Sequence, residues 1–78
     1  MRLDVYANIF RPLGTGEPYL VVASAFPCDR KQREPIPTGG SAIAITFEEA
    51  IEKRRELAQW LRESLELRGD EVRTVQVR

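Results

Sequence analysis

Residues 46–69 read TFEEAIEKRRELAQWLRESLELRG, and this stretch decides the fold of the 78-residue chain. Thr46 followed by Glu49 forms the S/T-x-x-E capping box, which pairs backbone N–H groups at the first turn of a helix, and Gly69 supplies a stop. Apolar side chains recur between these points at the spacing of a helix that buries one stripe. The stretch therefore predicts one long helix from Thr46 to Arg68. Its apolar stripe comprises Phe47, Ala50, Ile51, Leu57, Ala58, Leu61 and Leu65.

The chain before this helix has the pattern of β-strands. Residues 3–10 alternate apolar and polar side chains, which predicts a half-buried strand. Residues 19–26 are apolar on both faces, which is typical of an inner strand. The Pro- and Gly-containing residues 11–18 between them predict a hairpin loop, so we expect the two strands to pair antiparallel.

Two further segments complete the expected sheet. Residues 41–45 predict a short third strand, and residues 70–78 predict a last strand that returns to the sheet after the helix. Residues 27–40 contain several prolines and a run of charges, so we expect an exposed loop there. The order β-β-β-α-β predicts a single α+β domain over residues 1–78, in which the helix packs across a small, largely antiparallel sheet of three to four strands.

Composition argues against several classes of function. Twelve Lys and Arg balance twelve Asp and Glu, so no overall field attracts nucleic acid or anionic lipid. Histidine is absent, which removes the commonest general base and metal ligand, and the single cysteine, Cys28, allows neither an internal disulfide nor a Cys-based zinc site. The longest uncharged run, residues 19–28, is too short to span a bilayer. We therefore expect a cytoplasmic, non-enzymatic protein with no catalytic residues, cofactor, metal or membrane anchor.

Two large apolar side chains of the predicted helix lie off its stripe. Trp60 and Leu67 are about 120–140° from the centre of the stripe, so a single sheet below the helix leaves them uncovered. Either another segment of the chain packs on them, or they bind a partner, as exposed tryptophans often do. Arg54 instead lies near the centre of the stripe, where its guanidinium either reaches a carboxylate or a strand end or contacts an anion.

A basic cluster in the loop, Arg30, Lys31 and Arg33, is the second candidate contact. Asp29 and Glu34 flank it and leave a net charge of about one unit, whereas tight binding to DNA needs several phosphate contacts. The cluster therefore indicates at most weak binding of nucleic acid. The candidate partner-binding residues are Trp60, Leu67, Arg30, Lys31 and Arg33.

Several of these segments resemble a known family. Phe26-Pro27, then Thr46-Phe47-Glu48-Glu49-Ala50-Ile51 and the amphipathic run to Trp60-Leu61, are similar to the HicB-type antitoxin domain, in which a strand ending in Phe-Pro precedes a helix that starts T-x-E-E-A. The resemblance covers roughly Tyr19 to Leu65, and the Pro-Gly-Cys element common in the family's loop is missing from this chain. It implies toxin neutralisation. The size and simple α+β build are also similar to those of small phage-encoded inhibitors such as anti-CRISPR proteins.

Together these observations predict a small protein-binding module, of the inhibitor or antitoxin type, that docks on a partner macromolecule. A homodimer formed by strand addition at an edge of the small sheet is a second expected assembly. The alternative function is weak binding of nucleic acid through the loop cluster.

Overall fold

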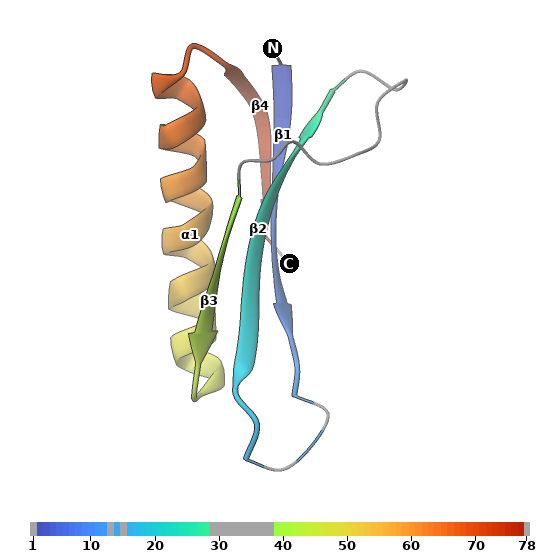
Figure 1. Ribbon diagram of the computed structural model, residues 1–78, viewed down its shortest axis with the longest axis vertical. Coiled ribbons are helices and arrows are strands. Elements are labelled where there is room, and N and C mark those ends of the chain that lie inside the picture. The colour runs from blue at the N-terminus through green and yellow to red at the C-terminus, as the bar shows by residue number, and fades with distance from the viewer. Residues whose placement is uncertain (1, 13, 15, 29–38, 78) are drawn as a thin grey trace.

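The computed structural model describes residues 2–12, 14, 16–28 and 39–77, and it places one helix against a four-stranded sheet (Figure 1). The chain order β-β-β-α-β and the α+β class predicted from the sequence are confirmed. The elements are β1 (Arg2–Phe10), β2 (Tyr19–Pro27), β3 (Gly39–Ala44), α1 (Phe47–Leu67) and β4 (Glu71–Val77).

The strand order is β3-β2-β1-β4, and the sheet is mixed. β1 pairs antiparallel with β2, as the predicted hairpin requires, and β2 pairs antiparallel with β3. β4 instead lies parallel to β1, because the chain leaves the sheet at the β3 edge, runs through α1 and returns at the opposite edge. The last strand therefore pairs with β1, the first strand of the chain, and not with β3, the strand that precedes it in sequence.

Local hydrogen bonds begin and end α1 close to the predicted points. The Thr46 hydroxyl accepts the Glu49 N–H at 3.2 Å, which is the predicted cap. The reciprocal bond differs from a standard capping box, because the Glu49 carboxylate accepts the N–H of Ile45 at 3.3 Å. At the other end Gly69 has φ +92°, a left-handed conformation that glycine adopts without strain, and the Asp70 N–H bonds back to the Leu65 carbonyl.

The predicted loop over residues 27–40 is too long at both ends. β2 continues to Pro27, and β3 begins at Gly39, which lies opposite Ser24. A Cβ at Gly39 would lie 2.8 Å from the Ala23 carbonyl oxygen, so at this point glycine allows the backbones to approach. Residues 29–38 of the predicted loop lie outside the described residues.

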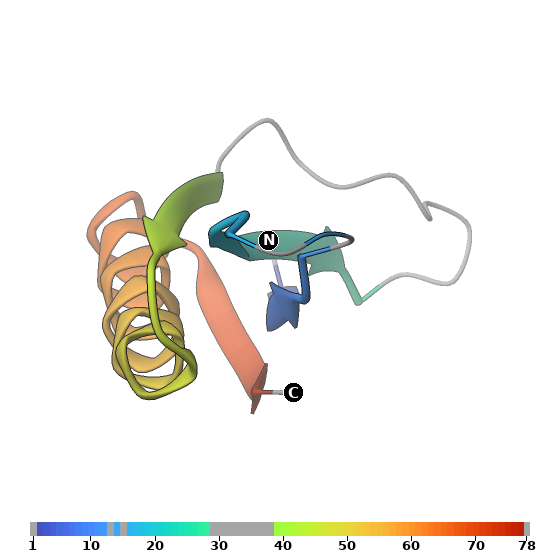
Figure 2. The ribbon, with the colours of Figure 1, turned by 90° about the horizontal axis from the view of Figure 1, so that it is seen from below.

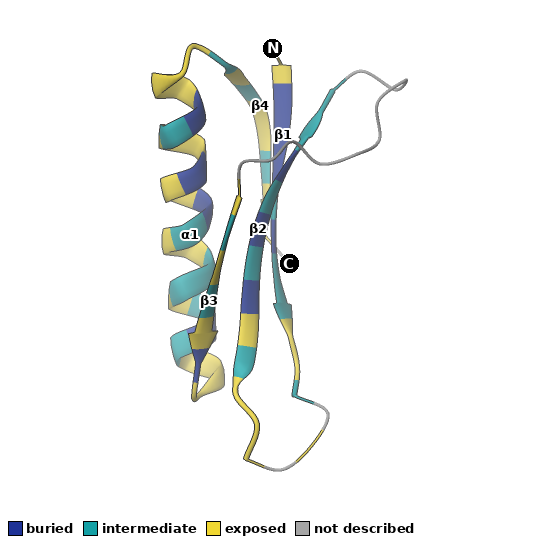
Figure 3. Cartoon of the chain, viewed as in Figure 1, coloured by how far each residue is buried: buried dark blue, intermediate teal, exposed yellow. Residues whose placement is uncertain are grey.

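The core lies between α1 and one face of the sheet (Figure 2). Leu61 and Leu65 of α1 are fully buried against Leu3 and Val5 of β1, and Figure 3 shows buried residues alternating with less buried ones along β2. Every buried apolar residue of α1 was predicted on its stripe: Ala50, Ala58, Leu61 and Leu65. Within the described residues, no helix is both long enough and apolar enough to cross a bilayer.

Candidate docking surfaces

The second face of the sheet carries no other described element (Figure 2). We call this surface the open sheet face, and its central side chains are Tyr6, Asn8, Phe10, Leu20, Val22, Ser24, Phe26, Ser41 and Ile43. They alternate with the buried residues of β1, β2 and β3, so they point away from α1. An uncovered face of an antiparallel sheet normally carries polar side chains. Six of these nine residues are instead apolar or aromatic.

A continuous apolar row crosses one end of the open sheet face. Phe10 lies opposite Leu20, and Leu20 lies opposite Ile43, so the three side chains are neighbours across three strands. They are 53%, 43% and 60% exposed. Further along the same face, the rings of Tyr6 and Phe26 meet edge to face with centroids 5.4 Å apart. The face therefore combines exposed aliphatic surface with an ordered aromatic pair.

A buried carboxylate holds β4 to β1 at the other end of this face. Asp4 is only 6% exposed, and it accepts hydrogen bonds from Arg73 Nε at 3.1 Å and from Arg73 Nη2 at 2.8 Å. The Thr74 hydroxyl donates to the same carboxylate at 2.8 Å. Both residues reach Asp4 because the register of β4 shifts between Leu3 and Asp4, which leaves Arg73 as the extra residue of a bulge.

The hydrogen bonds also decide the ionisation of this cluster. Burial by itself would raise the pKa of Asp4, but the hydrogen bonds from Arg73, Thr74 and Cys28 outweigh burial and lower it below its ordinary value. For Cys28, burial and then the hydrogen bond to Asp4 raise the pKa of the thiol. Cys28 is therefore held protonated, which makes it a poor nucleophile. The hydrogen bonds of Asp4 therefore hold β4 beside β1.

Trp60, a predicted partner contact, is half-buried on the β3 edge of the molecule. Its ring lies over Gly40, where a Cβ would come within 2.9 Å of Cζ3. The side chain remains 47% exposed and lines a shallow hollow with Ala42, Lys53, Glu56 and Leu57. The absence of a side chain at Gly40 therefore leaves space for the indole ring. We call the surface formed by Trp60 and the four residues of this hollow the Trp60 edge. The sequence shows the exposed tryptophan, but its seat depends on the pairing of β3.

Leu67, another predicted contact, does not join Trp60 in one site. Leu67 is 89% exposed near the end of α1, where it lines a separate hollow with Glu63 and Glu66. The loop cluster of Arg30, Lys31 and Arg33 lies outside the described residues. Sequence reasoning missed the open sheet face, although the apolar residues at alternate positions opposite the core were a signal for it.

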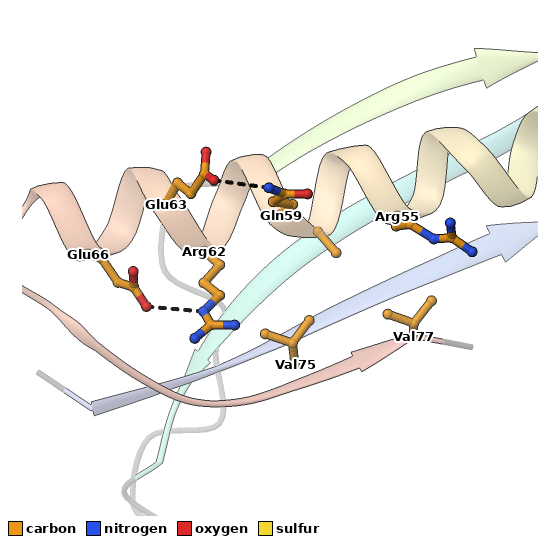
Figure 4. A pocket seen from close by; sticks show the side chains of 8 residues that line it. Arg55, Gln59, Arg62, Glu63, Glu66, Val75 and Val77 are labelled. Carbon is orange, nitrogen blue, oxygen red and sulfur yellow. Dashed lines mark hydrogen bonds and ion pairs between the residues drawn. The ribbon is translucent and has the colours of Figure 1, made fainter.

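A groove between α1 and β4 is lined by described residues of both elements (Figure 4). Its floor is apolar, with Val75 and Val77, and its helix wall is charged. On that wall Arg62 bonds Glu66 at 3.1 Å, and Gln59 donates to Glu63 at 3.1 Å. Two arginines, Arg55 and Arg62, and two glutamates line the groove, so it shows no concentration of one charge.

Arg54 lies on the buried stripe of α1, as predicted. Its Nε is buried and has no hydrogen-bond partner among the described residues. Among the described residues, neither a carboxylate nor a strand end pairs with this atom. A buried donor left without a partner costs about 1–3 kcal/mol of stability.

We expect Arg54→Met to raise the free energy of unfolding by about 1 kcal/mol, because methionine keeps an unbranched chain on the apolar stripe and removes the unpaired donor. Urea unfolding followed by circular dichroism measures the change. Arg55→Met is the matched control, since Arg55 is exposed on the adjacent helix position and its replacement should have little effect. A loss of 1 kcal/mol or more in Arg54→Met alone would show that the guanidinium has a stabilising partner.

Within the part of the chain that the structure describes, no group of three or more His, Cys, Asp or Glu side chains could hold a metal ion. Comparison of the chain with models of known protein families, with curated proteins and with solved structures found no match.

Proposed function

We propose that this chain is a small protein-binding module, of the inhibitor or antitoxin type, that acts by docking on another protein through its Trp60 edge. The observation that carries the proposal is a tryptophan seated on Gly40 with about half of its surface exposed. A large side chain that is already held in place loses little conformational freedom when a partner covers it, and tryptophan is among the residues most enriched in binding hot spots.

The surroundings of Trp60 support a protein partner. The hollow beside the ring combines apolar surface from Ala42 and Leu57 with one charge of each sign, from Lys53 and Glu56. A hot spot of this kind has an apolar centre and a polar rim. The similarity of residues 26–27 and 46–61 to the HicB-type antitoxin domain supports a toxin as the kind of partner.

The test is capture of a partner from the native host, followed by binding of the two purified proteins. We expect Trp60→Ala to weaken that binding by about 2 kcal/mol or more, roughly 30-fold in Kd, because truncating a hot-spot tryptophan has effects of this size. Circular dichroism should show that the variant stays folded, since the ring is half-exposed. Phe10→Ser, on the open sheet face, is the control and should leave the affinity unchanged.

Salt dependence separates this proposal from weak binding of nucleic acid. The logarithm of the affinity for nucleic acid falls with the logarithm of the salt concentration, with a slope of about 0.9 per phosphate contact. The affinity of an apolar protein interface changes little with salt. Docking through the Trp60 edge would be contradicted if the affinity for the partner fell steeply with salt concentration and the Trp60→Ala variant bound the partner as tightly as the wild type.

A further inference from the structure

We propose that the open sheet face binds the same face of a second copy of this chain, forming a symmetric dimer with the layers helix, sheet, sheet, helix. The proposal is independent of the docking function, because the Trp60 edge lies on the helix side of the molecule. A domain normally buries both faces of an apolar sheet, and here the described elements that lie outside the sheet, α1 alone, cover only one. Two open faces placed together would complete a sandwich of the kind formed by paired sheets.

The charges of this face allow a copy of itself as the occupant. Its described charged residues lie at one end, where Arg2 pairs with Glu71 at 3.6 Å and Asp4 pairs with Arg73 at 2.8 Å. The centre and the opposite end, from Tyr6 to the row that ends at Ile43, are uncharged. A symmetric interface brings each surface against itself, so a surface with an excess of one charge would repel its copy. The open sheet face has no such excess.

The size of the face is also sufficient for a specific dimer. Strands are about 4.8 Å apart and rise about 3.3 Å per residue, so four strands of this sheet present roughly 19 by 25 Å, or about 500 Å² in projection. Two copies then cover about 1,000 Å² in projection and more in accessible surface, because side chains make the face uneven; specific interfaces bury about 1,200–2,000 Å² in total. The apolar row supplies the desolvated centre that such an interface needs.

The edge of β3 is less suited to self-association than the face. Strand addition needs free backbone groups along an edge strand. At β3 the Ile43 carbonyl already accepts a hydrogen bond from Lys53 Nζ at 2.9 Å, and the same ammonium pairs with Glu49 at 3.2 Å. A lysine at this position is one of the ways in which proteins block pairing at an edge. The expected dimer by strand addition stays a prediction that the same experiment examines.

Sedimentation equilibrium of the full chain between about 1 and 500 μM, a range that brackets micromolar affinity, tests the proposal. We expect a dimer that dissociates on dilution. Leu20→Glu should weaken it at least 100-fold, because each copy would bury an unpaired carboxylate at the centre of the apolar row. Ile43→Glu, at the more exposed end of the row, provides a second variant if Leu20→Glu does not fold by circular dichroism.

Leu67→Glu is the matched control, because it adds the same charge at an exposed apolar residue outside the open sheet face. It should sediment as the wild-type protein does. A wild-type chain that stays monomeric over the whole range would overturn the proposal. Folded Leu20→Glu or Ile43→Glu variants that remain dimeric would overturn it as well, and would indicate association at a strand edge. Loss of partner binding in Trp60→Ala without any change in this equilibrium would separate the two surfaces.

Discussion

Asp4→Ala is expected to lower the free energy of unfolding by about 2–3 kcal/mol, a large share of the stability of so small a domain. The carboxylate is buried and accepts three hydrogen bonds from β4, two of them from one guanidinium. Removing one member of a fully buried ion pair costs more than this, but the Arg73 side chain is half-exposed and can return to water. Urea unfolding at neutral pH measures the loss.

The same carboxylate should make the stability depend on pH. The folded pKa of Asp4 lies below the ordinary value of 3.8, so its contribution is present above the unfolded pKa and is lost as the pH falls through the folded pKa. Wild-type protein should therefore lose stability below about pH 4 more steeply than Asp4→Asn. Glu49, whose pKa is also lowered, chiefly by its hydrogen bond with Lys53, is present in both proteins, so the difference between them isolates Asp4.

Glu71→Ala is the control for the Asp4 variants. It breaks the Arg2–Glu71 pair, which joins the same two strands but is exposed, so little change in stability is expected. If Asp4→Ala and Glu71→Ala had the same small effect, the buried cluster would not be what holds β4 beside β1.

Leu61→Ala should lower the free energy of unfolding by about 3 kcal/mol, because it removes a fully buried side chain and leaves a cavity. Leu61 packs in one cluster with Leu3, Val5 and Leu65, so it joins the middle of α1 to the central strand. In a domain of this size, each kcal/mol lowers Tm by about 4–8 °C. Thermal unfolding followed by circular dichroism should show a drop of at least ~10 °C.

Leu67→Ala provides a matched comparison with the same chemical change on the same helix. Leu67 is almost fully exposed, so its truncation should leave Tm within about 2 °C of the wild type. Equal losses in the two variants would contradict the packing of α1 described above. An effect of Leu67→Ala on partner binding alone would extend the docking surface beyond the Trp60 edge.

The contacts of Asp4 and Leu61, which these variants remove, hold the elements that form the two docking surfaces. The cluster around Asp4 fastens β4 beside β1, and it forms the polar end of the open sheet face. Gly40 in β3 seats Trp60, and the buried leucines of α1 and β1 pack the helix against the sheet. Rigid neighbours of this kind keep a binding surface ordered before a partner arrives.

The sequence alone was enough to predict the helix and the order of the elements. The cap at Thr46, the stop at Gly69 and the apolar stripe between them depend on residues that are near one another in sequence, as the hydrogen bonds of a helix do. The angle of Trp60 and Leu67 around the helix also placed both side chains off the buried stripe, and the structure shows them exposed. These features are local, so a linear pattern determines them.

Only the tertiary structure decided how distant segments meet. β4 pairs in parallel with β1, and the Asp4–Arg73 bond joins residues 69 positions apart. The seat of Trp60 on Gly40 and the unpaired Nε of Arg54 likewise depend on which strand lies below the helix. The period of a strand shows that it has two faces, but the tertiary packing decides which of the two faces α1 covers.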